Sequence, residues 1–229
     1  MTPNFLSDIL AAKRALSSLP LHWDGRASVL ELKAADYQWK QMEWWAFFFE
    51  HLCQRALVGV FQFPGERIGP VKFDAKRSVN WDLKSKAIKS DAHRAILNDK
   101  TAMEQSVRAH GEHGVMLALC DVEYNDHDRS FQRWHTDLKG GLSAYEHERL
   151  ARTSVSRYRK TSAGLTEILF LRFDARNLAL LGTMRQGRNS SGAARPEKYM
   201  IDLEAPGPFL AERLLYPSGL GTDLRVAEP

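Results

Sequence analysis

Hydrophobic residues recur at helical spacing from Leu30 to Leu57, and again from Asp99 to His110. The first stretch is rich in tryptophan and phenylalanine, and we expect it to form one long helix. In the second stretch, Met103 and Val107 lie four residues apart and Gly111 follows as a stop signal. This pattern predicts a shorter helix that ends at the glycine.

Between these helical stretches lie two short runs in which apolar and polar residues alternate, as in strands with one buried face. In the run from Val71 to Ala75, Asp74 lies on the polar face. In the run from Asn80 to Ser85, Asp82 and Lys84 share the polar face and the apolar residues point the opposite way. The repeated partition predicts that the two runs pair as a hairpin.

A turn over residues 77–79 would join these runs and set Asp74 directly opposite Asp82. Two carboxylates at that distance repel each other unless a cation lies between them. A few hard oxygen ligands, completed by waters and a phosphate, favour Mg²⁺ over a closed zinc site. Lys84 would then hold the attacking water and stabilise charge on the phosphate. The alternative is a solvated hairpin, because lysines are frequent throughout this region.

The D-L-K triplet at residues 82–84, preceded by Asp74, resembles the PD-(D/E)xK nuclease superfamily, to which many type II restriction endonucleases belong. Phe73 stands where that family often has proline. The superfamily core runs helix, antiparallel strands with the two acidic positions, helix and a further strand. The continuous apolar run from Val115 to Cys120 is typical of such a covered strand. The resemblance covers residues 30–124.

The resemblance implies a mixed α/β fold with a restriction-endonuclease-like core, in which helices flank a central mixed sheet. It implies Asp74 and Asp82 as Mg²⁺ ligands, and Lys84 as the residue that orients the water or helps to deprotonate it. With 229 residues and 44% hydrophobic content, the chain can bury a sizeable core as one domain. Residues 125–229 would then supply contacts to DNA.

Many of these nucleases add an acidic residue from the first helix, and Glu43 and Glu50 are the candidates here. Seven residues apart on one helix, they would lie on nearly the same face. Glu50 follows three phenylalanines, and a carboxylate in an aromatic surface lacks water and is kept for a partner. We therefore favour Glu50; the alternative is that both side chains point to solvent.

A second triplet, Asp137-Leu138-Lys139, is a rival metal site, but the two glycines that follow do not suit a strand. Asp121 or Glu123, which close the apolar run, could assist the first site. Another possibility is a His-Asn-His nuclease, based on His127 and His135 with Asp126, but no suitably placed asparagine and third ligand follow. Each histidine is better interpreted as a surface residue.

The sequence also argues against membrane proteins, secreted proteins and proteins held together by disulfides. No apolar stretch is long enough to cross a membrane and the N-terminus lacks the pattern of a signal peptide, so we expect a cytoplasmic protein. The two cysteines, Cys53 and Cys120, lie in apolar segments and are expected to be small buried side chains rather than a disulfide.

The net charge is only +4, but positive residues gather in two segments. The first mixes basic and hydroxyl side chains suited to phosphate contacts; its basic members are Arg149, Arg152, Arg157, Arg159 and Lys160. The second combines glycines with side chains able to reach base edges; its members include Arg185, Gln186, Arg188, Asn189 and Arg195. The alternative for both segments is an ordinary solvated surface.

These features together favour a Mg²⁺-dependent endonuclease of double-stranded DNA, similar to a sequence-specific type II restriction enzyme. A homodimer is expected, because palindromic sites are matched by two-fold protein symmetry. Two alternatives stay open. One is a nucleic-acid-binding protein without catalysis, and the other is a repair or defence nuclease that acts on branched, modified or single-stranded substrates.

Overall fold

The computed structural model describes residues 1–64, 73–88, 93–142, 146–147, 158–185, 187 and 194–216, and every structural statement below concerns these residues. The helices are α1 (Pro3–Leu16), α2 (Gly25–Ala34), α3 (Trp44–Leu57), α4 (Lys100–His110) and α5 (Ser130–Leu138). The strands are β1 (His22–Asp24), β2 (Ala75–Lys76), β3 (Asn80–Ala87), β4 (Arg94–Asp99), β5 (Glu112–Glu123), β6 (Ser162–Asp174), β7 (Gly182–Arg185), β8 (Glu197–Asp202) and β9 (Leu210–Leu215). The expectation of a mixed α/β protein is confirmed.

The main sheet has six strands in the order β1-β6-β5-β3-β2, and β9 also pairs with β6. Strands β3 and β5 run parallel over their whole contact, while the other pairs in the sheet are antiparallel. The sheet is therefore mixed, and β3 lies inside it with neighbours on both sides. A second, antiparallel sheet has the order β4-β8-β7.

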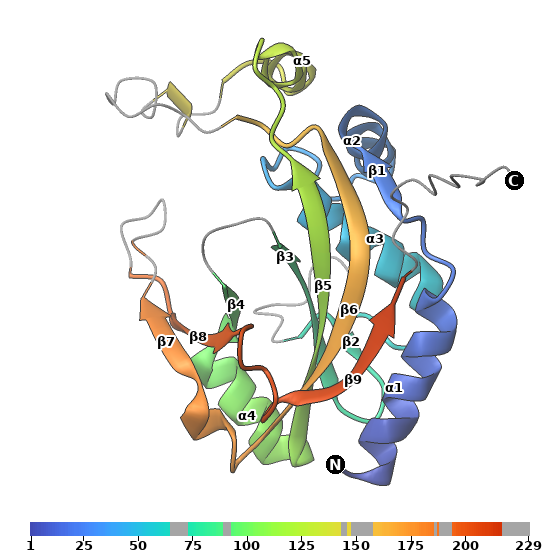
Figure 1. The fold of residues 1–229 in the computed structure, drawn as a ribbon, viewed down its shortest axis with the longest axis vertical. Coiled ribbons are helices and arrows are strands. Elements are labelled where there is room, and N and C mark those ends of the chain that lie inside the picture. The colour runs from blue at the N-terminus through green and yellow to red at the C-terminus, as the bar shows by residue number, and fades with distance from the viewer. Residues whose placement is uncertain are drawn as a thin grey trace, which may run out of the picture.

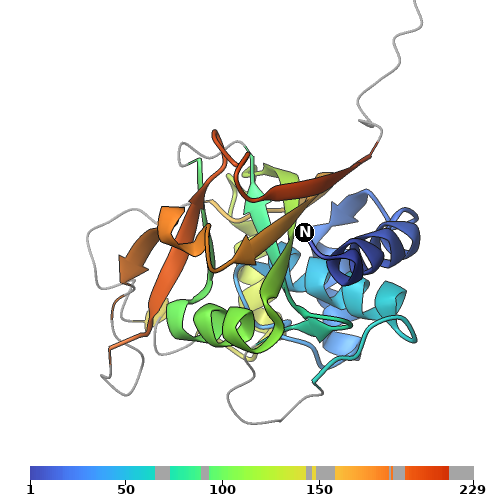
Figure 2. The same cartoon turned by 90° about the horizontal axis from the view of Figure 1, so that it is seen from below.

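Two layers cover the opposite faces of the main sheet (Figures 1 and 2). On one face, α1, α2 and α3 pack over a core that includes Trp81 and Leu83 of β3. On the other face, α4 and the small sheet enclose a second core that includes Val115 and Leu117 of β5. Successive residues of β5 thus point into different cores, because Met116 and Ala118 belong to the first core and Val115 and Leu117 to the second, which explains why β5 is apolar almost throughout.

The expectation of one long helix from Leu30 to Leu57 is wrong. The structure has two helices, α2 and α3, separated by residues 35–43. Asp36 and Gln38 in this connection adopt positive φ angles of 50° and 43°, which a continuing helix does not allow. Hydrophobic spacing continues across the break, because both helices pack on the same core, so periodicity alone did not reveal it.

The other predicted elements agree closely with the structure. Helix α4 begins after Asp99 and ends at Gly111, whose φ of 78° is the left-handed conformation that glycine adopts readily. The apolar run from Val115 to Cys120 is the centre of β5. Cys53 and Cys120 are buried and free, as expected. None of the described helices is long and apolar enough to cross a membrane.

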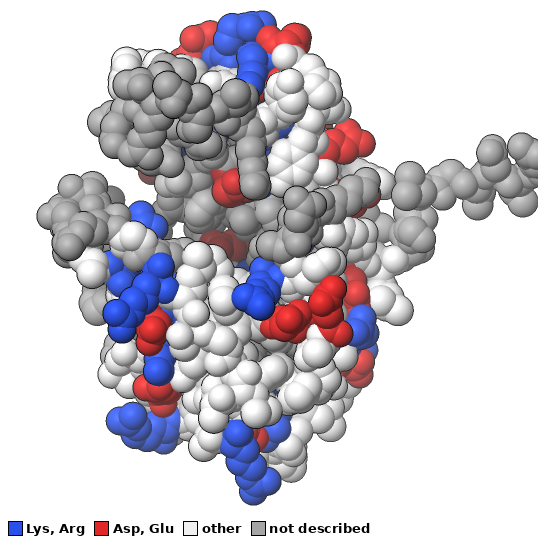
Figure 3. Space-filling model, turned by 60° about the vertical axis from the view of Figure 1, so that its left-hand side comes forward, with Lys and Arg blue, Asp and Glu red and all other residues white. Residues whose placement is uncertain are grey.

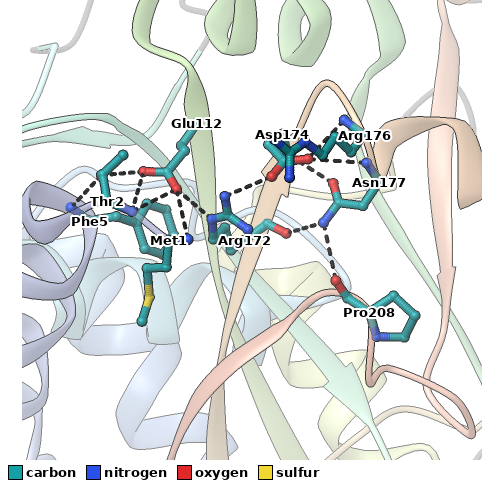
Figure 4. A network of polar contacts seen from close by, with 9 residues as sticks. All are labelled: Met1, Thr2, Phe5, Glu112, Arg172, Asp174, Arg176, Asn177 and Pro208. Atoms are coloured by element: carbon teal, nitrogen blue, oxygen red, sulfur yellow. Dashed lines mark hydrogen bonds and ion pairs between the residues drawn. The ribbon is translucent and has the colours of Figure 1, made fainter.

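A polar network fixes the start of α1 against the main sheet (Figure 4). The side chain of Glu112, 3% exposed, accepts a hydrogen bond from the backbone N of Thr2 at 3.1 Å and pairs with Arg172. Thr2 in turn caps α1 by accepting a hydrogen bond from Phe5 N. Burial alone would raise the pKa of Glu112, but the hydrogen bonds from Thr2 and Arg172 lower it. This carboxylate is fully engaged in holding the structure.

Candidate active site

The hairpin predicted from the sequence is present, but it is shorter than expected. Ala75 pairs with Trp81 and Lys76 with Asn80, about a turn at residues 77–79. Strand β2 begins only at Ala75, and the backbone N of Asp74 donates to Trp81 O at 3.0 Å. Asp74 therefore lies at the end of the hairpin rather than within a strand pair opposite Asp82.

The side chain of Asp74 bends toward β3 and joins Lys84. Asp74 Oδ2 accepts hydrogen bonds from Leu83 N at 2.8 Å and from Lys84 Nζ at 3.0 Å. Burial would lower the pKa of Lys84, but the carboxylates of Asp74, Asp82 and Glu50 raise it above its usual value. The three acidic side chains around Lys84 therefore favour its protonated, positively charged form.

Asp82 is the most buried of these acids, with its side chain 1% exposed. Its Oδ2 accepts hydrogen bonds from Asn98 Nδ2 at 2.8 Å and from His113 Nε2 at 3.1 Å. Its Oδ1 is also buried but has no hydrogen-bond partner among the described residues. Burial alone would raise the pKa of Asp82, but His113 and Lys84 lower it, so the group is an anion. One carboxylate oxygen is held in place and the other is unpartnered.

His113 links Asp82 to helix α4. Its Nδ1 lies 3.0 Å from Ser106 Oγ, and its ring is fully buried. An ionised carboxylate only accepts hydrogen bonds, so His113 Nε2 is the donor to Asp82. Neither Asn98 nor His113 belongs to the triplet, so the sequence pattern did not point to them. The signal that places His113 beside the site is the parallel pairing of His113 with Asn80, which cannot be read from the sequence.

Of the two helix acids, Glu50 lies near the site and Glu43 does not. Glu50 accepts a hydrogen bond from Tyr37 Oη at 3.0 Å. Burial and the nearby charge of Asp74 raise its pKa to about 7. Glu43 precedes α3 instead of sharing a helical face with Glu50, and it pairs with Lys160. The expectation that both acids lie on one helical face is wrong.

The rival triplet lies elsewhere, at the end of α5. Lys139 Nζ binds Glu146 at 3.0 Å, and no strand carries this triplet. His135 is 4% exposed and its Nε2 lies 2.9 Å from Trp39 O. The expectation of a surface histidine is therefore wrong for His135. The ring of His127 packs against Tyr158.

The two basic segments are only partly described. Arg159 and Lys160 are buried and form ion pairs with Glu146 and Glu43, so neither offers an exposed charge. Arg185 is exposed, with its Nε 3.5 Å from Glu197 Oε1. The remaining predicted DNA contacts, Arg157, Gln186, Arg188 and Asn189, lie outside the described residues. On the face shown in Figure 3, the described positive side chains are interspersed with negative ones.

Within the described ranges, no three His, Cys, Asp or Glu side chains group closely enough to hold a metal ion by themselves. A cleft of about 590 Å³ lies elsewhere, between α2 and α3, and none of Glu50, Asp74, Asp82 and Lys84 lines it. The geometry therefore consists of an acid and lysine cluster at the hairpin end, with one unpartnered buried oxygen. Comparisons with known protein families, curated proteins and solved structures found no match for this chain.

Proposed function

We propose that this protein is a Mg²⁺-dependent nuclease that hydrolyses phosphodiester bonds of DNA, with a site similar to that of the PD-(D/E)xK superfamily. The observation that carries the proposal is the buried Oδ1 of Asp82, which has no hydrogen-bond partner among the described residues. A buried polar atom without a partner costs about 1–3 kcal/mol. A ligand that binds Asp82 Oδ1 would offset this cost, which explains why the fold retains the atom without a partner.

The donor set fits magnesium. Mg²⁺ keeps several waters and is commonly bound through one or two carboxylates and substrate phosphates, so a closed cage of three side chains is not required. Asp82 and Asp74 would hold the ion. Once bound, it would supply Lewis-acid stabilisation of the phosphate and a more acidic water.

Four other side chains would orient the water, accept its proton and hold Asp82 in place. Because its pKa is raised, Lys84 stays protonated, which suits it to orient the water and to stabilise charge on the phosphate rather than to remove a proton. Glu50, with a pKa of about 7, is the better group to accept the proton of the water near neutral pH. His113 and Asn98 keep Asp82 in one orientation.

The restriction-like part of the proposal concerns the substrate. Sequence-specific cleavage of both strands of duplex DNA would require two copies of the chain, related by two-fold symmetry. The base-reading residues would come from the segment around Arg188. The alternative from another class is a nucleic-acid-binding protein without catalysis, and metal-dependent cleavage separates the two.

The test compares two matched lysines, each in a D-L-K triplet. Purified wild-type protein, Lys84→Ala and Lys139→Ala are incubated with plasmid, phage and single-stranded DNA, in Mg²⁺ or in EDTA. We expect the wild type and Lys139→Ala to cut only with Mg²⁺, and Lys84→Ala to be slower by on the order of 10²–10³-fold. Wild-type rates in Lys84→Ala, or loss of activity in Lys139→Ala alone, would contradict the assignment.

A further inference from the structure

Cations stacked on aromatic rings gather at one end of the molecule. The structure describes seven such contacts, and six of them lie where α2, α5, the start of α3 and the end of β5 meet, at the end that carries the α5 and α2 labels in Figure 1. The seventh, Lys100 over Tyr199, belongs to the opposite side of the fold. Such clustering is unexpected, because these contacts occur roughly once per 70–80 residues.

Trp39 lies at the centre of one group. Lys33 Nζ and Lys40 Nζ lie 5.1 Å and 5.2 Å from the centre of its ring. Trp39 belongs to the connection between α2 and α3, two residues after Tyr37, which donates its hydroxyl to Glu50. The connection thus leads from the acid cluster directly to Trp39.

Trp134 forms the second group and is joined to the first. The guanidinium of Arg26 lies 5.5 Å from the centre of the Trp134 ring. The ring of Trp134 stacks on that of His135, and His135 Nε2 lies 2.9 Å from Trp39 O. We call Arg26, Lys33, Trp39, Lys40 and Trp134 the cation–aromatic surface.

The charges on this surface are available to a ligand. Arg26, Lys33 and Lys40 are exposed, and none of them has a carboxylate partner within the described part of the chain. Trp39 and Trp134 are half-buried and pack at the margin of the larger core. Strand β3 also runs toward this end, because its last residues, Lys86 and Ala87, pair in parallel with Leu119 and Cys120 near the end of β5.

Aromatic faces beside free cations match one kind of ligand well. Unpaired bases stack on aromatic rings or on guanidinium planes, and their phosphates bind the neighbouring cations. In a duplex the base faces are already stacked on each other, so the tryptophan rings would gain little from it. Tryptophan rings beside cations therefore favour single-stranded over double-stranded nucleic acid.

We infer that the cation–aromatic surface binds unpaired nucleotides of the DNA next to the phosphate that the acid cluster cleaves. This inference rests on the proposed nuclease function, and it names the substrate class: DNA with a single-stranded segment beside the cut, in place of the continuous duplex that a restriction-like enzyme would cut. Tyr37 and Glu50 provide the physical connection between the two parts.

The test measures binding without cleavage. The affinities of a labelled oligothymidylate of about 15 nucleotides and of a duplex of equal length are measured in EDTA by fluorescence anisotropy. The variants are Trp39→Ala, Trp134→Ala, Trp134→Phe and the matched control Lys100→Ala, which removes the cation of the remote contact. We expect each alanine variant to bind the single strand on the order of tenfold more weakly, while Trp134→Phe and Lys100→Ala stay near wild type. Thermal melts check that each variant is folded.

Equal affinity of wild type and both alanine variants for the single strand would overturn the inference, as would equal losses for single strand and duplex. No binding of the single strand by wild type would also overturn it. The result of this binding test can be distinguished from the result of the cleavage test. Weakened binding in the tryptophan variants, together with no cleavage in any metal, would support the surface and refute the nuclease.

Discussion

Asp8 and Asp82 are both fully buried carboxylates that contact the same part of the fold, but the protein satisfies them differently. Asp8, on α1, accepts hydrogen bonds on both oxygens, from Arg77 Nη1, Ser78 N, Ser78 Oγ, Val79 N and Trp81 Nε1. Asp82 accepts them on Oδ2 alone and keeps Oδ1 unpartnered within the described chain.

The difference separates a structural acid from a candidate functional one. Asp8 fixes the hairpin turn to α1, and Glu112 similarly fixes the start of α1 to β5 and β6 (Figure 4). In both cases the protein supplies every partner that the carboxylate needs. Asp82 is held by only two donors, so a ligand from outside the chain would complete it.

The largest expected effect is on cleavage in Asp82→Asn. The amide retains the volume of the side chain but loses the charge and one ligand oxygen, so Mg²⁺-dependent cleavage should fall on the order of 10³-fold. The free energy of unfolding should change by only about 1 kcal/mol, because His113 and Asn98 can still donate to the remaining oxygen. Cleavage rates and urea unfolding measure both effects.

The same substitution at Asp8 should have the opposite profile. The amide of the variant would place an NH₂ group against donors that now meet an oxygen, so Asp8→Asn should lower the free energy of unfolding by roughly 3–5 kcal/mol. Where the variant remains folded, its cleavage should stay close to wild type. Loss of stability in Asp82→Asn and loss of activity alone in Asp8→Asn would reverse the assignment of the two acids.

The hairpin could be predicted because its information is local. Alternation fixes which side chains of β3 share a face, and the three-residue turn fixes the register through Ala75. The burial of Glu50 was also predicted from local context, since a carboxylate after three phenylalanines was expected to lack water. The raised pKa of Glu50 agrees with that reasoning.

The partners of Asp82 and the break between α2 and α3 could not be predicted in this way, because they depend on tertiary contacts and backbone conformation. Asn98 and His113 reach Asp82 only because β3 and β5 run parallel in one register and β4 ends beside them. The break between α2 and α3 depends on backbone conformations at Asp36 and Gln38, residue types that also occur within helices. No pattern in the sequence contains this information, so the partners of Asp82 were missed.

A smaller effect is expected at His113, which tests whether the orientation of Asp82 matters. His113→Gln preserves a donor that can reach Asp82, whereas His113→Ala removes it. The Mg²⁺ concentration needed for half-maximal cleavage should rise roughly 10–100-fold in His113→Ala, and His113→Gln should restore much of it. Excess Mg²⁺ should recover the rate of the alanine variant. Unchanged Mg²⁺ dependence with a lower rate would show that His113 only supports the fold.

The smallest expected effect is the pH dependence of stability, and it contrasts Glu50 with Glu43. Folding raises the pKa of Glu50 from 4.5 to about 7, so between these values the folded state holds a proton that the unfolded chain has released. The free energy of unfolding should therefore fall as pH rises from about 4.5 to about 7 in EDTA. Glu50→Gln should remove this decline.

Glu43 shows the opposite shift: burial alone would raise its pKa, but Lys160 lowers it. Ionised Glu43 therefore stabilises the fold at pH values above the pKa that it has in the unfolded chain. This stabilisation is lost as the pH falls through the lowered pKa of the folded state. Glu43→Gln should consequently cost stability at neutral pH and leave the Glu50 decline in place. Urea unfolding of the three proteins at several pH values measures these slopes, and identical slopes in wild type and Glu50→Gln would refute the role of Glu50.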